Sequence, residues 1–284
     1  MMKTNRVLKI LLDFFVLLCV LLPLISVWVW MEAYHRGYFA DDLSIRLPYK
    51  PQTISEVVLG VVGIAFIILT VVILEVIHNK KGRNAGNDYS LGGASIPGWL
   101  WDSYNTIGIF IFGAACQQFT AEFTKRFVGR LRPHFIDICR PVPTINSDLN
   151  TLGYIQDFTC TNSQATEYQL HDMRLSFPSA HSSFAMYTAI FFICYVQYKG
   201  KWRHSKLLRH LMQFCAVIAA WYVGLTRIQE HKHHWGDVAC GFLNGAAFAL
   251  LVFVYVLKPK KHISLWEEPT TPPAHMLPRP VLTR

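Results

Sequence analysis

Charged side chains are scarce in this chain. Only 16% of its 284 residues are Asp, Glu, Lys or Arg, whereas hydrophobic residues make up 52%. A soluble domain of this size usually carries about 25% charged residues. The deficit argues against a soluble globular protein and indicates that lipid is the solvent for much of the chain.

The sequence also lacks two common motifs. No Asn-x-Ser/Thr sequon occurs, so N-glycosylation is not expected. No Cys-x-x-Cys pair occurs, so the seven cysteines offer no metal-ligand spacing. Cys139 and Cys160 share one long polar loop and can form a disulfide if that loop lies outside the cytosol. The sequence leaves open whether they do.

The net charge is +9, which raises the question of nucleic acid. The Lys and Arg residues, however, cluster at the ends of apolar runs. Topology signals and phosphate-binding groups belong at those positions. We therefore expect membrane lipids as partners, and no nucleic acid.

Long apolar runs recur along almost the whole chain. A helix of about 20 apolar residues crosses a bilayer core, and six segments qualify: residues 7–30, 54–77, 104–123, 181–198, 208–225 and 238–257. The first is too long for a signal peptide and lacks a clear cleavage site. The sequence predicts an all-α fold with one six-helix membrane domain over residues 1–257. Residues 258–284 are rich in proline and predict a disordered cytosolic tail.

The distribution of Lys and Arg among the loops predicts the orientation. Sixteen of the 27 lie at the N-terminus, in residues 78–103 and 199–209, and in the tail. The side with more Lys and Arg faces the cytosol. Both termini are therefore predicted to be cytosolic. The loops 31–53, 124–180 and 226–237 are predicted to be extracellular or lumenal, with the plasma membrane as the expected location.

Three polar clusters lie at helix ends on that outer side. They span residues 125–133, 177–183 and 226–237, at the exit of the third segment, the entry of the fourth and between the fifth and sixth. Because spanning helices alternate in direction, these positions share one face. The sequence predicts a common site there.

The first chemical group in these clusters is cationic. Lys125, Arg132 and Arg227 supply fixed positive charge, and Arg presents paired donors that suit phosphate. Ser179 and the backbone N–H of Ala180 lie where a helix begins, and a helix N-terminus favours phosphate. These five residues are candidate phosphate ligands.

The second group is made of proton carriers. His181 and His233 each exchange a proton near neutral pH. Asp237 follows His233 by four residues, so a continuing helix places both on one face. We expect Asp237 to hold one imidazole nitrogen of His233 and leave the other as a nucleophile. The alternative is that Asp237 caps the sixth helix, a common role for Asp at a helix N-terminus, and the two roles are compatible.

These spacings resemble the lipid phosphate phosphatases of the type 2 phosphatidic acid phosphatase superfamily. The family's motifs are K-x6-R-P, P-S-G-H and S-R-x5-H-x3-D. The matching residues here are Lys125 to Arg132-Pro133, Pro178-Ser179-Ala180-His181, and Thr226-Arg227 to His233 and Asp237. The resemblance covers nearly all of the chain except the tail.

The resemblance implies a mechanism and a substrate class. His233 attacks phosphorus and forms a phosphohistidine, Asp237 orients His233, and His181 protonates the leaving alcohol and then activates water. The candidate phosphate ligands hold the phosphate oxygens. No metal or other cofactor is implied. The family's substrates are phosphatidate, lysophosphatidate, sphingosine 1-phosphate and ceramide 1-phosphate.

Two residues depart from the family motifs. Thr226 replaces Ser and keeps the hydroxyl group. Ala180 replaces Gly; a positive φ there would strain Ala by about 1 kcal/mol, whereas use of its N–H alone would not. We favour the second case.

Several residues have a plainer interpretation. His231 and His234 compete with His233 in the same loop, and only the motif spacing selects His233. Arg126 and Arg130 are interpreted as membrane-flanking groups. Lys125 and Arg132, taken alone, have the same interpretation. Lys and Arg usually gather on the cytosolic side, however, whereas these two are predicted to lie on the outer side, which favours a functional role. Glu56, Glu75 and Glu122 are predicted to be solvated at helix ends, and Gly241 and Gly245 to allow close helix packing.

Other functions compete with hydrolysis of lipid phosphates. A catalytically weak relative would bind phospholipids or transfer their phosphate groups, and the sequence separates a transferase poorly from a hydrolase. A channel or transporter would favour charges near mid-membrane in several helices, whereas these charges cluster at one rim. The sequence is compatible with a homo-oligomer.

Overall fold

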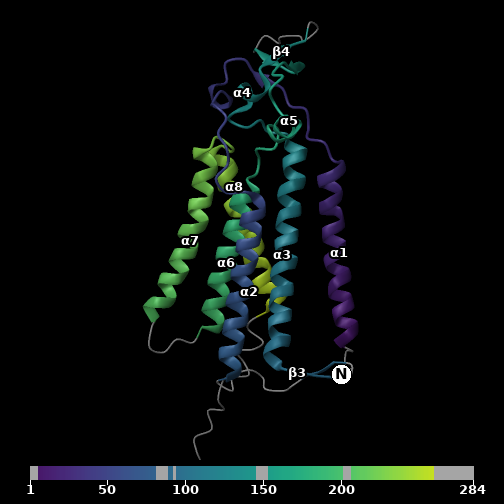
Figure 1. Cartoon of the computed structure of the whole chain (residues 1–284), viewed down its shortest axis with the longest axis vertical. Coiled ribbons are helices and arrows are strands. Elements are labelled where there is room, and N and C mark those ends of the chain that lie inside the picture. Colours follow the sequence, from purple (N-terminus) through teal and green to yellow (C-terminus); the bar gives the residue numbers. More distant parts are fainter. Residues whose placement is uncertain (1–5, 81–88, 92–93, 145–152, 201–205, 259–284) are drawn as a thin grey trace, which may run out of the picture.

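The computed structural model describes residues 6–80, 89–91, 94–144, 153–200 and 206–258. Long helices run side by side along one axis of a mostly helical protein (Figure 1). They are α1 (Arg6–Trp30), α2 (Glu56–Lys80), α3 (Gly98–Val128), α6 (Ala180–Lys199), α7 (Lys206–Gln229) and α8 (Trp235–Leu251), which a π-helical turn extends over Val252–Leu257. The predicted tail beyond residue 258 lies outside the described residues.

The apolar runs match these helices, and α3 differs most from its predicted range. It begins six residues earlier than predicted and ends at Val128, where Gly129 adopts φ 57° and caps the helix. The polar residues Lys125 and Arg126 thus belong to the helix, although the apolar run stops at residue 123. Hydropathy located the apolar middle of α3 and missed the polar turn at each end.

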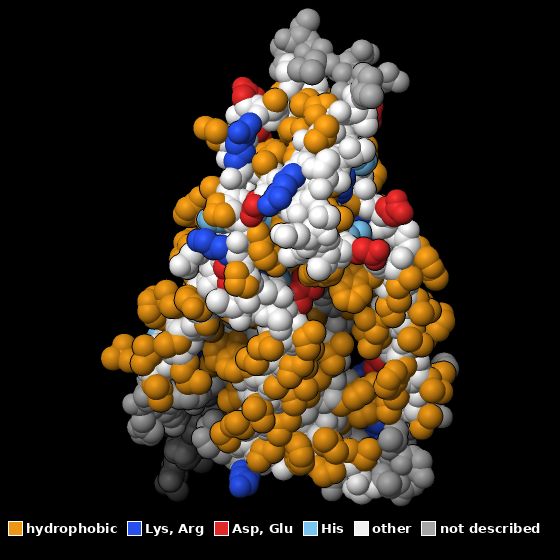
Figure 2. All heavy atoms as spheres, turned by 45° about the horizontal axis from the view of Figure 1, so that its top comes forward, with side chains coloured by type: hydrophobic (Ala, Val, Ile, Leu, Met, Phe, Trp, Pro, Cys, Tyr) orange, Lys and Arg blue, Asp and Glu red, His pale blue; other side chains and the backbone are white. Residues whose placement is uncertain are grey.

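Among the described residues, four helical segments are long and apolar enough to cross a membrane: Arg6–Trp30, Glu56–Lys80, Leu207–Gln229 and Trp235–Leu257. Helices α3 and α6 carry more polar side chains, many of them buried, including Gln117, Glu122 and Ser183. Exposed apolar side chains form a broad belt in Figure 2, and most of the charged side chains in this view lie to one side of it. This belt is the surface that lipid would cover.

The helix core lies where α2, α3, α6 and α8 meet. It contains Ile67, Phe110, Tyr187 and Phe191, each no more than 1% exposed. The Tyr187 hydroxyl donates to the Phe110 carbonyl at 2.7 Å, so the buried polar group is satisfied. The packing fixes α6 against α3 beneath the polar end of the bundle.

Two glycines bring α8 against α6. A Cβ added to Gly241 would collide with the Ser179 carbonyl, and one added to Gly245 would collide with the Ser183 carbonyl. The prediction of close packing at this Gly-x-x-x-Gly pair is therefore confirmed. Ser179 is the N-cap of α6 and belongs to the polar cluster of residues 177–183, so this contact holds that cluster against α8.

A small cap covers one end of the bundle (Figure 1). Because the cap contains short strands, the fold is not purely helical, in contrast to the all-α prediction. Two antiparallel ladders pair β1 (Tyr38–Phe39) with β5 (Tyr154–Ile155) and β4 (Pro141–Pro143) with β6 (Phe158–Cys160). The cap also contains α4 (Phe135–Cys139), α5 (Glu167–Asp172) and the 3-10 turn Leu43–Ile45. At the other end of the bundle, β2 (Tyr89–Leu91) pairs with β3 (Ala94–Ile96).

The cap has a hydrophobic core of its own. Tyr38, Phe135 and Phe158 form it through edge-on or tilted ring contacts 5.2–5.5 Å between centroids. Cys139 and Cys160 form a disulfide beside this cluster, which answers the question that the sequence left open. The apolar side chains of this core are scattered along the polar loops in the sequence, and folding brings them together.

A buried ion pair lies toward the opposite end of the bundle. Glu75 on α2 is fully buried, with its Oε1 2.9 Å from the Lys199 Nζ and 2.7 Å from the Tyr195 hydroxyl. The prediction that Glu75 is solvated is wrong. A buried carboxylate needs such partners, because desolvation without them is costly.

Candidate active site

The three polar clusters meet at the capped end of the bundle. They lie at the end of α3, at the start of α6 and in the loop between α7 and α8 (Figure 1). Backbone hydrogen bonds join their neighbourhoods: Arg132 N donates to the Met173 carbonyl at 2.8 Å, and Ser179 N donates to the Asp237 carbonyl at 3.0 Å. Helix direction thus places the clusters at one end, and these bonds fix them to one another.

His233 lies in the α7–α8 loop and is 2% exposed. Its Nδ1 is 2.6 Å from the Ser176 carbonyl oxygen, which only accepts, so Nδ1 carries the hydrogen. Within the described chain no residue hydrogen-bonds the His233 Nε2. The ring is therefore held in the tautomer whose Nε2 lone pair is available.

Asp237 does not hold the His233 ring directly, contrary to expectation. Its Oδ2 is 4.0 Å from the His233 Nδ1 and instead accepts from the Ser176 hydroxyl at 2.5 Å. His233 and Asp237 do not share a helix, because α8 begins at Trp235, three residues before its predicted range, and Asp237 caps α8 by accepting from the His234 N–H at 3.0 Å. Asp237 therefore fixes Ser176, and Ser176 fixes His233.

Arg130 is the ionic partner of Asp237. Its Nη1 lies 2.6 Å from the Asp237 Oδ1, although the Arg130 side chain is 37% exposed and Asp237 is fully buried. The interpretation of Arg130 as a mere flanking group is wrong. A buried carboxylate with a cation, a hydroxyl and a backbone N–H as partners is held in its ionised form.

The surroundings of His233 keep its ring neutral. Burial lowers the pKa of His233 well below its usual value, and the positive charges of Arg132 and Lys125 lower it further. A neutral imidazole is required for nucleophilic attack. The same cations that would hold a phosphate therefore also keep the candidate nucleophile unprotonated at neutral pH.

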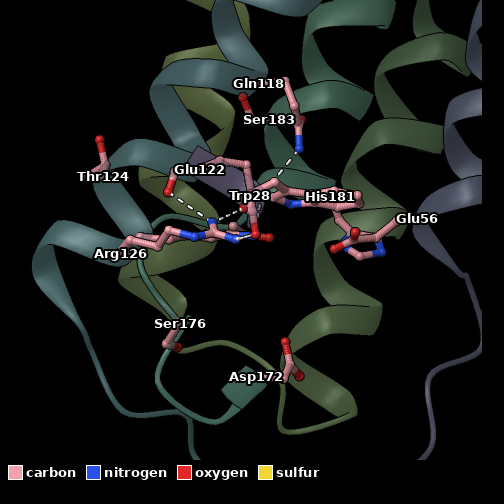
Figure 3. Close-up of polar contacts among 12 residues, drawn as sticks. Trp28, Glu56, Gln118, Glu122, Thr124, Arg126, Asp172, Ser176, His181 and Ser183 are labelled. Carbon is pink, nitrogen blue, oxygen red and sulfur yellow. Dashed lines mark hydrogen bonds and ion pairs between the residues drawn. The ribbon is translucent and has the colours of Figure 1, made fainter. Parts of the chain in front are cut away.

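His181 occupies the first turn of α6 and is 6% exposed. Its Nε2 lies 3.5 Å from the Arg227 Nη1, and the Ile54 backbone accepts a hydrogen bond from the ring. Figure 3 shows the His181 ring beside Glu56, whose Oε1 is 3.8 Å from the His181 Nδ1. Arg227 also lies beside His233, because its carbonyl accepts from the His233 N–H at 3.3 Å. Arg227 thus contacts the His181 ring through its guanidinium and the His233 backbone through its carbonyl.

Arg227 is 1% exposed and pairs with Glu230 across 2.7 Å. The same Glu230 accepts from both the backbone N–H and the hydroxyl of Thr53, at 2.7 and 2.5 Å. Sequence reasoning missed Glu230. Its position three residues after Arg227, one residue beyond the end of α7, was the available signal, since that spacing suits an ion pair.

Lys125 pairs with Glu122 across 2.9 Å, and both side chains are buried. Arg126 pairs with the other carboxylate oxygen of Glu122 across 2.8 Å. It also donates to the Met31 carbonyl at 3.0 Å, and Figure 3 shows its guanidinium near Trp28 of α1. The predictions of a solvated Glu122 and a flanking Arg126 are both wrong. Glu122 positions Lys125, and Arg126 ties the end of α1 to α3.

Arg132 is held by three acceptors. Its Nε donates to the Asp172 carbonyl at 2.8 Å, its Nη2 lies 2.6 Å from the Asp172 carboxylate, and its Nη1 donates to the Lys232 carbonyl at 3.3 Å. Asp172 ends α5, so the cap supplies this carboxylate. Sequence reasoning missed it because 40 residues separate the partners.

The remaining predicted residues lie at the start of α6 and the end of α7. Ser179 caps α6 by accepting from the Ser182 N–H at 3.4 Å. Ala180 is the first helical residue, and its φ is not positive. The absence of strain expected for Ala180 is therefore confirmed. The Thr226 hydroxyl donates to the Val223 carbonyl at 2.8 Å, a bond that a serine hydroxyl also makes.

The neighbouring histidines hold the α7–α8 loop in place. The ring of His134 contacts the His231 carbonyl at 2.7 Å through Nδ1, and His231 in turn bonds the Pro48 carbonyl at 2.8 Å. His234 donates from Nδ1 to Asp237 at 3.1 Å. His231 and His234, the two histidines that compete with His233 in the sequence, therefore have structural roles. Arg132 and Lys125 act electrostatically on the His233 ring.

The buried His134 makes stability depend on pH. Burial lowers the pKa of His134 from 6.5 to about 4, so between these values the unfolded chain binds a proton that the folded chain excludes. Stability therefore falls as pH drops below 6.5, by roughly 3 kcal/mol at pH 4 from this residue alone. We expect His134→Asn, which keeps an N–H donor, to flatten the fall in melting temperature between pH 7 and pH 4. An identical fall in both proteins would contradict the assignment.

Within the described residues, no three His, Cys, Asp or Glu side chains are grouped as ligands for a metal ion. Lys125, Arg132 and Arg227 all act electrostatically on His181, and Lys125 and Arg132 also act on His233. Fixed cations of this kind bind a doubly charged anion.

The chain is similar in sequence to several known proteins. Residues 106–261 match the PAP2 superfamily. A Drosophila melanogaster protein named "Putative phosphatidate phosphatase" is 38% identical over 284 residues, 96% of this chain and 73% of its own. Phospholipid phosphatase 2 of Mus musculus is 37% identical over 87% of this chain and 85% of its own, and Phospholipid phosphatase 1 of Rattus norvegicus is 38% identical over 90% and 87%. No solved structure matches significantly. The family match spans more than half of the chain and includes all three polar clusters, so the chain belongs to the PAP2 superfamily.

Proposed function

We propose that this chain is an integral membrane lipid phosphate phosphatase. Its substrates are phosphate monoesters such as phosphatidate, lysophosphatidate, sphingosine 1-phosphate and ceramide 1-phosphate, hydrolysed through a phosphohistidine. One observation carries the proposal. The buried His233 ring is fixed at Nδ1 by the Ser176 carbonyl, its Nε2 has no hydrogen-bond partner among the described residues, and Arg132, Lys125 and His181 act on the ring electrostatically.

In the first step, the His233 Nε2 lone pair attacks phosphorus. A P–N bond forms as the P–O bond to the lipid breaks, and the bonding electrons leave on the alcohol oxygen. That oxygen takes a proton from protonated His181, so a neutral alcohol departs. The Ser176 carbonyl accepts from the Nδ1–H of His233 and supports the positive charge that develops on the ring.

In the second step, neutral His181 accepts a proton from water as the water oxygen attacks phosphorus. The P–N bond breaks, its electrons return to the His233 Nε2, and inorganic phosphate leaves. Through both steps, Lys125, Arg132 and Arg227 stabilise the charge on the phosphate oxygens. The Ser179 hydroxyl and the Ala180 N–H complete this set at the α6 N-terminus.

Asp237 acts on His233 through Ser176 in this proposal. Its carboxylate accepts from the Ser176 hydroxyl, and the Ser176 carbonyl accepts from the His233 ring. Asp237 also supplies negative charge 4.0 Å from the His233 Nδ1, which favours the cationic ring of the intermediate.

We further propose that six helices span the membrane, with both termini cytosolic and the catalytic end extracellular or lumenal, in the plasma membrane. Helices α3 and α6 lie within the bundle beside the four apolar spans, which supports the count (Figure 1). The Cys139–Cys160 disulfide supports the placement of the cap, since disulfides persist in oxidising compartments. The proposal is compatible with a homo-oligomer and does not depend on subunit number.

A phosphate-release assay on the purified protein tests this function. We expect release of inorganic phosphate from all four lipid substrates, inhibition by vanadate, and less than a twofold change on addition of EDTA. Fixed cations neutralise the phosphate in the proposed mechanism, so removal of free divalent metal ions leaves the reaction intact. Strong EDTA inhibition would overturn metal independence. Phosphate transfer to an added alcohol without release to water would favour the alternative, a weak relative that binds or transfers phospholipid phosphate.

A further inference from the structure

A carboxylate outside the three motifs faces His181. Glu56 begins α2, and its Oε1 lies 3.8 Å from the His181 Nδ1 (Figure 3). Its side chain is 48% exposed, whereas His181 is buried. Among the described residues, Glu56 is the carboxylate that comes within 4 Å of this ring.

The surroundings of the two histidines repeat one arrangement. The His233 ring bonds the Ser176 carbonyl, with the Asp237 carboxylate 4.0 Å from its Nδ1. The His181 ring bonds the Ile54 backbone, with the Glu56 carboxylate 3.8 Å from its Nδ1. In each pair, a backbone carbonyl sets the ring and a nearby carboxylate supplies negative charge.

The segment that carries Glu56 is fixed to the active-site loop. Thr53 donates two hydrogen bonds to Glu230, the partner of Arg227. The Lys50 ammonium donates to the Gln229 carbonyl at 3.0 Å. Glu56 follows Thr53 by three residues, in the first turn of α2. Its place beside His181 is therefore set by the same loop that carries His233.

The charge on His181 also requires a counterpart. The charged and titratable groups that act on the ring from the elements around it are Lys125 of α3, Arg132 after α3, Arg227 of α7, His233 of the α7–α8 loop and Glu56 of α2. Three of the five are permanent cations, and like charges disfavour an imidazolium. A general acid must nevertheless hold a proton at Nε2, and Glu56 is the group of opposite sign.

We propose that Glu56 is a positioning residue for His181, which keeps the ring turned toward α2 and stabilises the imidazolium that protonates the leaving alcohol. The inference rests on the proposed function, because it assigns a proton donor for the same reaction. Solvent screens a half-exposed carboxylate, so the effect is smaller than that of His181 itself.

Glu56→Gln tests this with two leaving groups. Lysophosphatidate releases a poor alcohol leaving group that needs a proton, whereas p-nitrophenyl phosphate releases a phenolate that does not. We expect the variant to lower kcat for lysophosphatidate by about tenfold and for p-nitrophenyl phosphate by less than about threefold, with the alkaline limb of the lysophosphatidate pH profile moved to lower pH. Glu167→Gln, an exposed carboxylate at the first turn of α5, is the matched control.

A double variant separates positioning from general structural damage. In a His181→Ala background, Glu56→Gln is expected to change kcat by less than about twofold, because the group it serves is gone. Equal losses on both esters, or no loss on either, would overturn the inference. Absence of hydrolysis by the unaltered protein would instead overturn the proposed function, so the two failures are distinguishable.

Discussion

His233→Ala is expected to lower phosphate release by more than about 10³-fold while the protein still inserts into the membrane. The substitution removes the only atom assigned to attack phosphorus. It also leaves the Ser176 carbonyl without its ring partner, at a modest cost of about 1–3 kcal/mol in stability. The expected loss is therefore catalytic, with the fold retained.

The measurement follows both turnover and the covalent intermediate. Protein mixed with lysophosphatidate labelled at phosphorus is quenched in alkali, in which phosphohistidine persists, and the bound label is counted. We expect label on the unaltered protein and none on His233→Ala. His171→Ala, an exposed histidine in α5, is the matched control and should retain both label and turnover. Label retained on His233→Ala would assign the nucleophile to another residue.

Arg227→Lys is expected to lower kcat by about 10²- to 10³-fold. Arg227 contacts both histidine residues, with its guanidinium 3.5 Å from the His181 Nε2 and its backbone carbonyl bonded to the backbone N–H of His233. Lysine keeps the charge that faces Glu230 but lacks the planar fork that bonds two phosphate oxygens at once. Transition-state stabilisation is thus lost although a cation remains.

Comparison with Arg227→Ala separates catalysis from stability. Alanine leaves the buried Glu230 without its ionic partner, which we expect to destabilise the fold by about 3–5 kcal/mol and lower the melting temperature. Arg227→Lys should melt close to the unaltered protein. Arg140→Lys, an exposed arginine in the cap, is the control for kcat. Full activity in Arg227→Lys would refute the phosphate-binding role.

Several residues around the site became identifiable only through their contacts. Glu122, Asp172 and Glu230 each pair with one of the three cations that sequence reasoning selected. Two of these pairs are three residues apart, one within α3 and one at the end of α7, so local spacing contained a signal for them. The Arg132–Asp172 pair joins α5 of the cap to the end of α3, and no local pattern predicts such a contact.

The sequence by itself determined the helix layout, the end of the bundle where the polar clusters meet, and the spacing that selects His233, His181 and the cations. Apolar length and helix direction are properties of the chain alone, so they are readable before folding. The tertiary structure decided which group holds each ring: Ser176 for His233, with Asp237 behind it, and Ile54 and Glu56 for His181. These contacts join segments 57 to 127 residues apart, and only packing of α2, α6 and α8 brings hydrogen-bonding groups that distant to within 4 Å.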